Sequence, residues 1–191
     1  VNALSIKEYD RVNEMSNFLT SQKDYLLNAK DTLLNIIDEM DAVMKSQFVT
    51  TFNSINIEFG KVFKNLFKGG NAYLVLTDPD NILESGVEIK ACPPGKKLQS
   101  ISLLSGGEKT FTAISLLFAI LNIKSVPFCI FDEVEAALDD ANVESFGSYL
   151  NSYKDKTQFI LITHKKKTME FADILYGITM QESGISKLVS V

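Results

Sequence analysis

The stretch FCIFDEVEAALD, residues 128–139, decides the fold, because it indicates a buried strand that ends in two adjacent acids. Ligands of open α/β sheets gather at the carboxyl ends of the strands. Asp132 is therefore placed to hold a water of a Mg²⁺ ion, which keeps most of its waters and takes few carboxylates. We expect Glu133 to point the other way along the pleat, where it could orient and deprotonate an attacking water. An acid pair that only caps the next helix is the alternative, and the four apolar residues before it weaken that interpretation.

Asp139 follows Glu133 closely enough to lie beside the same site. A second apolar strand, FILITH at residues 159–164, ends in the only histidine of the chain. A histidine at such a strand end can hydrogen-bond a phosphate or a water beside it. A lone histidine is more often structural, and that alternative stays open for His164 taken by itself.

The segment LSGGEK, which begins at Leu104, stands directly before a predicted helix. The Ser105 hydroxyl and the unobstructed N–H groups of Gly106 and Gly107 suit an anion at the positive end of the helix dipole. Phosphate is the expected guest of this segment, which also includes Glu108. The alternative is that the serine only caps the helix after a turn.

Strands alternate with helices over residues 48–191, which indicates an α/β layer architecture. Strands are predicted at 72–77, 87–91, 128–131, 158–163, 174–179 and 185–189, and helices at 106–121 and 141–153. The long helical pattern before them ends at Gly69-Gly70. We therefore predict one lobe with a mixed sheet and flanking helices.

Residues 1–47 carry a heptad pattern, in which mainly apolar side chains recur at alternating spacings of three and four. The seam consists of Val12, Met15, Leu19, Gln22, Leu26, Ala29, Leu33, Ile36, Met40 and Val43. Polar residues fill most positions between, so the stripe is narrow and suits one partner helix. An amphipathic helix lying on a globular core is the alternative, and it needs a broader apolar face. The pattern predicts a coiled-coil neck.

Composition narrows the class of protein. The chain has 191 residues, of which 46% are apolar and 23% charged, with a formal net charge of −5. We expect a folded cytosolic protein whose DNA contacts, if any, are local or belong to a partner. Cys92 and Cys129 lack metal-ligand spacing, so both are interpreted as reduced thiols. No apolar stretch approaches the roughly 20 residues that a membrane helix needs.

Residues 103–109, 132–139 and 163–164 together resemble the signature motif, Walker B strand, D-loop and switch histidine of ATP-binding-cassette (ABC) ATPases. The fuller match looks like the C-terminal head half of a bacterial structural-maintenance-of-chromosomes (SMC) protein. This resemblance implies ATP and Mg²⁺ as cofactors. No G-x-x-x-x-G-K-[ST] segment exists in the chain to cradle phosphates, and Gly95-Lys96-Lys97 is interpreted as a turn. In the family that loop lies in the N-terminal half of the head, separated from this half by the coil and hinge.

The resemblance also implies how the site works. Two heads would sandwich two ATP molecules, and Ser105–Gly107 would serve the nucleotide of the opposite head. Three other residues would serve the nucleotide of their own head, namely Asp132 through Mg²⁺, Glu133 as general base and His164 on the γ-phosphate side. The implied partners are the N-terminal half of the same head, a second head, a kleisin subunit, and DNA through the full complex, without a membrane. The implied role is chromosome condensation and segregation in the bacterial cytoplasm, at the nucleoid.

Three alternatives remain. A coiled-coil ABC ATPase of double-strand-break repair shares the motifs, but the match over residues 132–139 favours the chromosome-organising branch. A transporter ATPase subunit usually carries glutamine where Glu108 stands, and it has no heptad segment. The third alternative is a coiled-coil scaffold with a decayed head. Against it stands the joint retention of four residues, namely Ser105, Asp132, Glu133 and His164.

Overall fold

The computed structural model describes residues 3–182 and 184–190 of the chain. The chain divides into two compact units, residues 1–49 and 50–191. Helix α1 (Ala3–Leu66) contributes residues to both units. Sequence predictions that involve residues 1, 2, 183 and 191 lie outside the described residues.

The part of α1 in the first unit exposes the predicted seam. Leu26 and Leu33, for example, are 64% and 61% exposed. Further exposed apolar side chains flank the seam, namely Phe18, Leu27, Leu34, Ile37 and Met44. The apolar face of this segment is therefore broader than the predicted narrow stripe, because residues adjacent to the seam positions also carry large apolar side chains.

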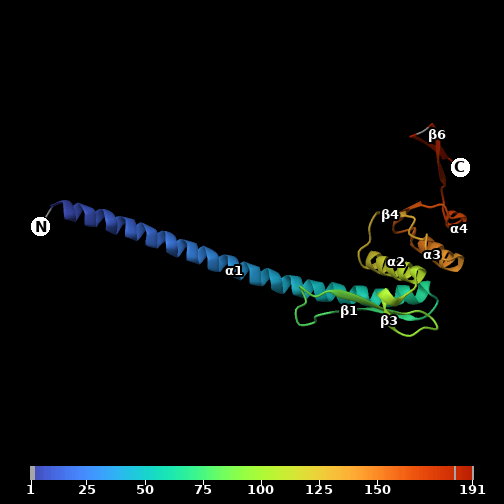
Figure 1. Cartoon of the computed structure of the whole chain (residues 1–191), viewed down its shortest axis with the longest axis horizontal. Helices are drawn as coiled ribbons and strands as arrows, with labels where there is room; N and C mark the ends of the chain where they lie inside the picture. The colour runs from blue at the N-terminus through green and yellow to red at the C-terminus, as the bar shows by residue number, and fades with distance from the viewer. Residues whose placement is uncertain (1–2, 183, 191) are drawn as a thin grey trace. The chain divides into compact units, whose positions relative to one another are not determined.

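The last turns of α1 form part of the core of the second unit. Phe59 and Phe63 are fully buried there, and Val62 and Leu66 are each 2% exposed. Strand β1 (Asn71–Leu76) lies beside this part of the helix (Figure 1). The side-chain amide of Asn56 joins the two, because its Oδ1 accepts from the N–H of Leu74 (2.7 Å) and its Nδ2 donates to the carbonyl of Leu74 (3.2 Å).

Helix α1 stops at the glycines that the sequence indicated. The N–H of Gly69 reaches back to the carbonyl of Lys64 (2.9 Å), and Lys68 adopts a left-handed φ of 55°, as in a Schellman ending. Gly70 also has a positive φ, and a Cβ on it would lie 2.4 Å from the carbonyl oxygen of Cys92. Only glycine fits this close approach of the helix end to the next sheet.

The first sheet is antiparallel, with strand order β1-β2-β3. It contains β2 (Val87–Cys92) and the two-residue β3 (Gln99–Ser100) beside β1. A short 3₁₀ helix, η1 (Ile101–Leu103), leads from this sheet to α2 (Gly106–Ile123).

The second sheet consists of β4 (Phe128–Asp132) and β5 (Gln158–Ile162), which pair directly in parallel. Helix α3 (Asp140–Tyr153) lies in the connection between the two strands. Aromatic side chains fill the space between this sheet and the helices. The ring of Phe118 on α2 lies 6.1 Å from that of Phe131 and 6.0 Å from that of Phe146. Long-range aromatic packing therefore holds β4 in place near its carboxyl end, where the candidate site lies.

The opposite face of the second sheet is apolar and bare. Its side chains are Phe128 and Ile130 on β4, each 55% exposed, and Ile160 and Ile162 on β5, which are 45% and 52% exposed. Parallel sheets in known proteins are almost always covered on both faces. We call this surface the bare sheet face.

The chain continues through α4 (Lys166–Met169) to a hairpin of β6 (Tyr176–Glu182) and β7 (Ile185–Ser190). The predicted α/β class is confirmed, and each predicted strand and helix has a counterpart. The strands form three separate sheets rather than one mixed sheet, because the strands on either side of β4 and β5 pair with their own neighbours in sequence. No helix among the described residues is long and apolar enough to cross a membrane.

Candidate functional site

The predicted acid pair lies where β4 ends. Asp132 is the last residue of the strand, and the N–H of Glu133 still donates to the carbonyl of Ile162 on β5 (2.9 Å). Glu133 then adopts a left-handed φ of 47°, a strained conformation that costs a non-glycine residue on the order of 1–3 kcal/mol. A tight turn, rather than the alternation of the pleat, therefore sets the direction of this carboxylate, which corrects the sequence-based expectation.

The structure brings Glu133 and His164 together, and we call them the acid–histidine pair. Nδ1 of His164 lies 3.2 Å from Oε1 of Glu133. The side chain of Glu133 is 54% exposed and that of His164 is 69% exposed. The attraction between them therefore adds little to the stability of the fold. The contact instead restricts where the carboxylate points, at the carboxyl ends of both parallel strands.

Two further contacts join the loop after β4 to the segment after β5. The Thr163 hydroxyl donates to Oε1 of Glu135, a carboxylate that is 1% exposed and whose Oε2 has no hydrogen-bond partner among the described residues. Nζ of Lys165 donates to the carbonyl of Leu138 (2.6 Å). These contacts hold the two segments of the acid–histidine pair together. The motif match includes Glu135 and Thr163, but sequence analysis assigned no site role to them or to Lys165. An acid within the apolar run 134–138 was a usable signal.

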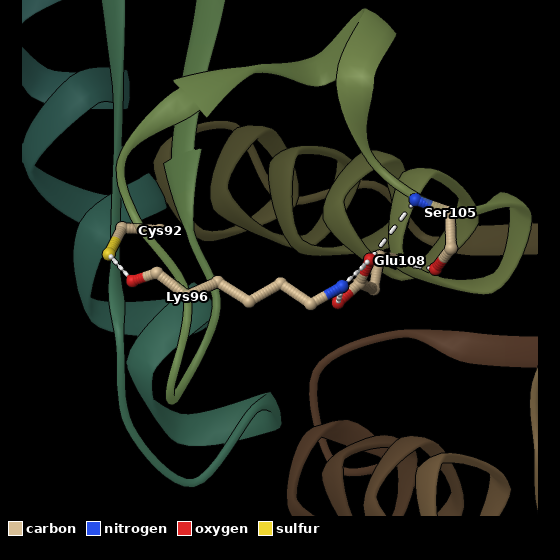
Figure 2. A network of polar contacts seen from close by, with 4 residues as sticks. All are labelled: Cys92, Lys96, Ser105 and Glu108. Carbon is tan, nitrogen blue, oxygen red and sulfur yellow. Dashed lines mark hydrogen bonds and ion pairs between the residues drawn. The ribbon is translucent and has the colours of Figure 1, made fainter.

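The N-terminus of α2 carries the predicted signature residues. Ser105 is the N-cap residue, and the carboxylate of Glu108 accepts from its backbone N–H (3.0 Å) and from its hydroxyl (2.7 Å). Figure 2 shows the side chain of Lys96 extending from its turn to the same carboxylate, at 2.8 Å from Oε1. The ammonium of Lys96, and after it the Ser105 hydroxyl, hold the pKa of Glu108 below its ordinary value. The exposed Ser105 thus begins the helix and is also accessible to a ligand.

The two glycines of the signature segment differ in what the fold requires. A Cβ on Gly107 would lie 2.8 Å from the carbonyl oxygen of Ala137, so only glycine lets α2 approach the loop after β4. A Cβ on Gly106 would meet nothing within 4 Å, and its φ is not positive. The fold therefore explains Gly107, whereas nothing within the described residues requires glycine at position 106.

Two predicted site residues have roles within the fold. The side chain of Leu104 is 4% exposed in the hydrophobic core, so it anchors the segment and does not face a ligand. Asp139 caps α3, because its Oδ1 accepts from the N–H of Asn142 (2.8 Å). Its other carboxylate oxygen has no such role in the cap.

The acids at the end of β4 are the candidate ligands of a magnesium ion. Within the described residues, no group of three or more His, Cys, Asp or Glu side chains gathers that could hold a metal ion by itself. Asp132 is exposed at a strand end, and one carboxylate suits a Mg²⁺ ion that keeps its waters and binds nucleotide phosphates. The donor set therefore fits a Mg²⁺ to which this chain contributes Asp132. Cys92 and Cys129 are free thiols.

Comparison with known proteins places this geometry in a family. Residues 5–187 match the family described as RecF/RecN/SMC N terminal domain. The chain is 59% identical over its full length to the chromosome partition protein Smc of Bacillus subtilis (strain 168), of which it spans 16%. The chain therefore belongs to the RecF/RecN/SMC N terminal domain family.

Solved structures agree with this assignment. The Smc head domain with an extended coiled coil from Pyrococcus furiosus, solved with the C-terminal domain of ScpA, matches with a TM-score of 0.75 and 36% identity. That match covers 98% of this chain and 47% of the other. A structure from work on ATP-driven dimerization and DNA-stimulated activation of SMC ATPases matches with a TM-score of 0.72 and 40% identity, over 77% of this chain and 89% of that one. The fold is that of an SMC ATPase head.

Proposed function

We propose that the chain is the C-terminal half of an SMC ATPase head, with residues 48–191 as the lobe and 1–47 as the end of the returning coiled coil. The observation that carries this proposal is the set of motifs. The chain has the signature segment, the acid pair and the histidine, but no loop of the G-x-x-x-x-G-K-[ST] type to cradle phosphates. Nearly the whole chain matches 47% of a solved Smc head, which supports the same division of the head into two halves.

The bare sheet face gives the proposed partner half a surface to cover. Four apolar side chains are about half exposed there, namely Phe128, Ile130, Ile160 and Ile162. Among the described residues, each strand of this two-stranded sheet also has one unpaired edge. Apolar burial contributes roughly 25 cal/mol per Å². Strands and a helix from the N-terminal half would thus extend the sheet and cover its apolar side.

Within one head, the residues at the ends of β4 and β5 act on the nucleotide bound by that head. Asp132 would hold a water of the Mg²⁺ ion, and the ion would supply charge neutralisation at the phosphates. Glu133 accepts the proton of the attacking water at a carboxylate oxygen, and its contact with His164 at 3.2 Å keeps that carboxylate directed. His164, whose side chain is 69% exposed, would also be accessible to the γ-phosphate.

The N-terminus of α2 acts on the nucleotide of the opposite head. The exposed Ser105 and Gly106 offer a hydroxyl and an open N–H group at the positive end of the helix dipole. The open space at Gly106 supports this role, because a ligand that approaches the backbone from outside the chain gives a reason for glycine there. Leu104 and Gly107 hold this segment in place, and Asp139 lies in the adjoining loop.

The complete protein would use ATP-driven engagement and release of two such heads for chromosome condensation and segregation at the bacterial nucleoid. The name of the relative from Bacillus subtilis supports this role, and the structure from Pyrococcus furiosus supports a kleisin such as ScpA as a partner of the head. DNA would be bound by the full complex.

We expect the chain alone to show no ATP hydrolysis, and the chain mixed with the N-terminal head segment of the same protein to hydrolyse ATP. The missing phosphate loop supplies preorganised donors, and loss of such donors lowers turnover by roughly 10²-fold or more. The measurement is steady-state phosphate release with and without the added half. The mixture containing Glu133→Gln controls for a contaminating ATPase. A divided site would be contradicted if the chain alone hydrolysed ATP steadily and the Glu133→Gln substitution abolished that hydrolysis.

The neck provides a further prediction. Changing Leu26 and Leu33 to Asp should abolish pairing with the matching N-terminal helix, because each aliphatic side chain contributes on the order of 1.5–3 kcal/mol when fully buried. Cross-linking across the neck measures the pairing. The matched control changes the exposed residues Asn28 and Asn35 to Asp, which adds the same charges away from the seam. Cross-linking that survives the leucine changes would mean that the seam is misassigned.

A further inference from the structure

Lys96 lies in the turn between β2 and β3 and has no role in the sequence motifs. Its ammonium lies 2.8 Å from Oε1 and 2.9 Å from Oε2 of Glu108 on α2. The turn that carries it is fixed at both sides. The N–H of Lys96 donates to the carbonyl of Pro93 (3.1 Å), and its own carbonyl accepts from the thiol of Cys92 (3.1 Å) (Figure 2).

Glu108 links this lysine to the signature serine. One of its oxygens, Oε2, accepts from the N–H and the hydroxyl of Ser105. A hydroxyl has one proton, so a Ser105 hydroxyl that donates to Glu108 presents only lone pairs to its surroundings. Phosphate oxygens are acceptors. To bind a phosphate, the hydroxyl must therefore turn its proton away from Glu108, and the carboxylate loses one donor at that moment.

We propose that Lys96 is a positioning residue that holds Glu108 so that the Ser105 hydroxyl can release this carboxylate and donate to a phosphate of the opposite nucleotide. The inference rests on the proposed function of Ser105. After the hydroxyl turns, the ammonium of Lys96 and the N–H of Ser105 still satisfy the carboxylate. The ammonium also neutralises a charge that would otherwise repel the incoming phosphate.

Removing Lys96 should therefore weaken engagement of two heads without weakening ATP loading. The test uses the head completed with its N-terminal half and carrying Glu133→Gln, so that engaged dimers accumulate. Lys96→Met should raise the ATP concentration for half-maximal dimerisation by about fivefold to tenfold, the scale of one typical intramolecular hydrogen bond. The Kd of ATP for monomeric heads should not change, because Lys96 serves the opposite nucleotide. Lys96→Arg should restore dimerisation, and Lys97→Met, the exposed neighbour, is the control.

A second substitution separates this role from a purely structural one. Glu108→Gln removes the negative charge that Lys96 holds, so Lys96→Met should change dimerisation by less than about twofold in that background. An effect of Lys96→Met that is equally large with Glu108 and with Glu108→Gln would overturn the proposal, as would dimerisation unchanged by Lys96→Met in the original background. A failure of this kind leaves the proposed function intact, because that function is tested separately by Ser105→Arg.

Discussion

Changing Glu133 to Gln should slow ATP hydrolysis by the completed head roughly 10²–10⁴-fold, the usual contribution of a general base. Gln keeps the size of the side chain and can still contact His164, but it cannot accept a proton from the attacking water. ATP binding and head engagement should therefore persist, and ATP-bound dimers should accumulate. Single-turnover hydrolysis and size-exclusion chromatography with ATP measure the two effects.

Glu144→Gln is the matched control for this change, because Glu144 is an exposed acid on α3 outside the site. It should leave both hydrolysis and the amount of dimer unchanged. Hydrolysis by the Glu133→Gln head at more than about a tenth of the unchanged rate would contradict the role of Glu133 as general base.

Changing Ser105 to Arg should abolish head engagement while ATP still loads. The substitution replaces the hydroxyl by a long cation at the N-terminus of α2, where the opposite nucleotide must approach. The positive end of the helix dipole makes a cation unfavourable there. We expect monomers in ATP and loss of hydrolysis. Ser148→Arg, at an exposed position of α3, adds the same cation elsewhere and should dimerise normally.

The order and type of the elements could be predicted from the sequence because their signals are local. The apolar run before Asp132, the glycines after α1 and the heptad spacing each act over a few residues. Pairing is not local, and the sequence did not reveal that β1, β2 and β3 form a sheet of their own. The extra apolar residues beside the seam, such as Leu27 and Leu34, were visible in the sequence but do not occupy the two seam positions of each heptad.

The site residues were found where a motif contains them and missed where the fold supplies them. Glu133 and His164 were predicted, but the left-handed φ of Glu133 depends on the turn after β4. Lys96 contacts Glu108 across a separation of 12 residues, and Thr163 contacts Glu135 across 28. No spacing rule predicts contacts of this kind, because they depend on how the elements pack.

The central claim is that this chain gives its signature segment to one nucleotide and its general base to another. The most direct test mixes completed heads that carry Ser105→Arg with completed heads that carry Glu133→Gln. In a heterodimer, one site contains both defects and the other contains neither, so a mixture of two inactive proteins should regain ATPase activity. Sizing in ATP should show monomers for Ser105→Arg alone and dimers for Glu133→Gln alone. No activity in a mixture that forms heterodimers, or Ser105→Arg dimers as abundant as those of Glu133→Gln, would contradict the account.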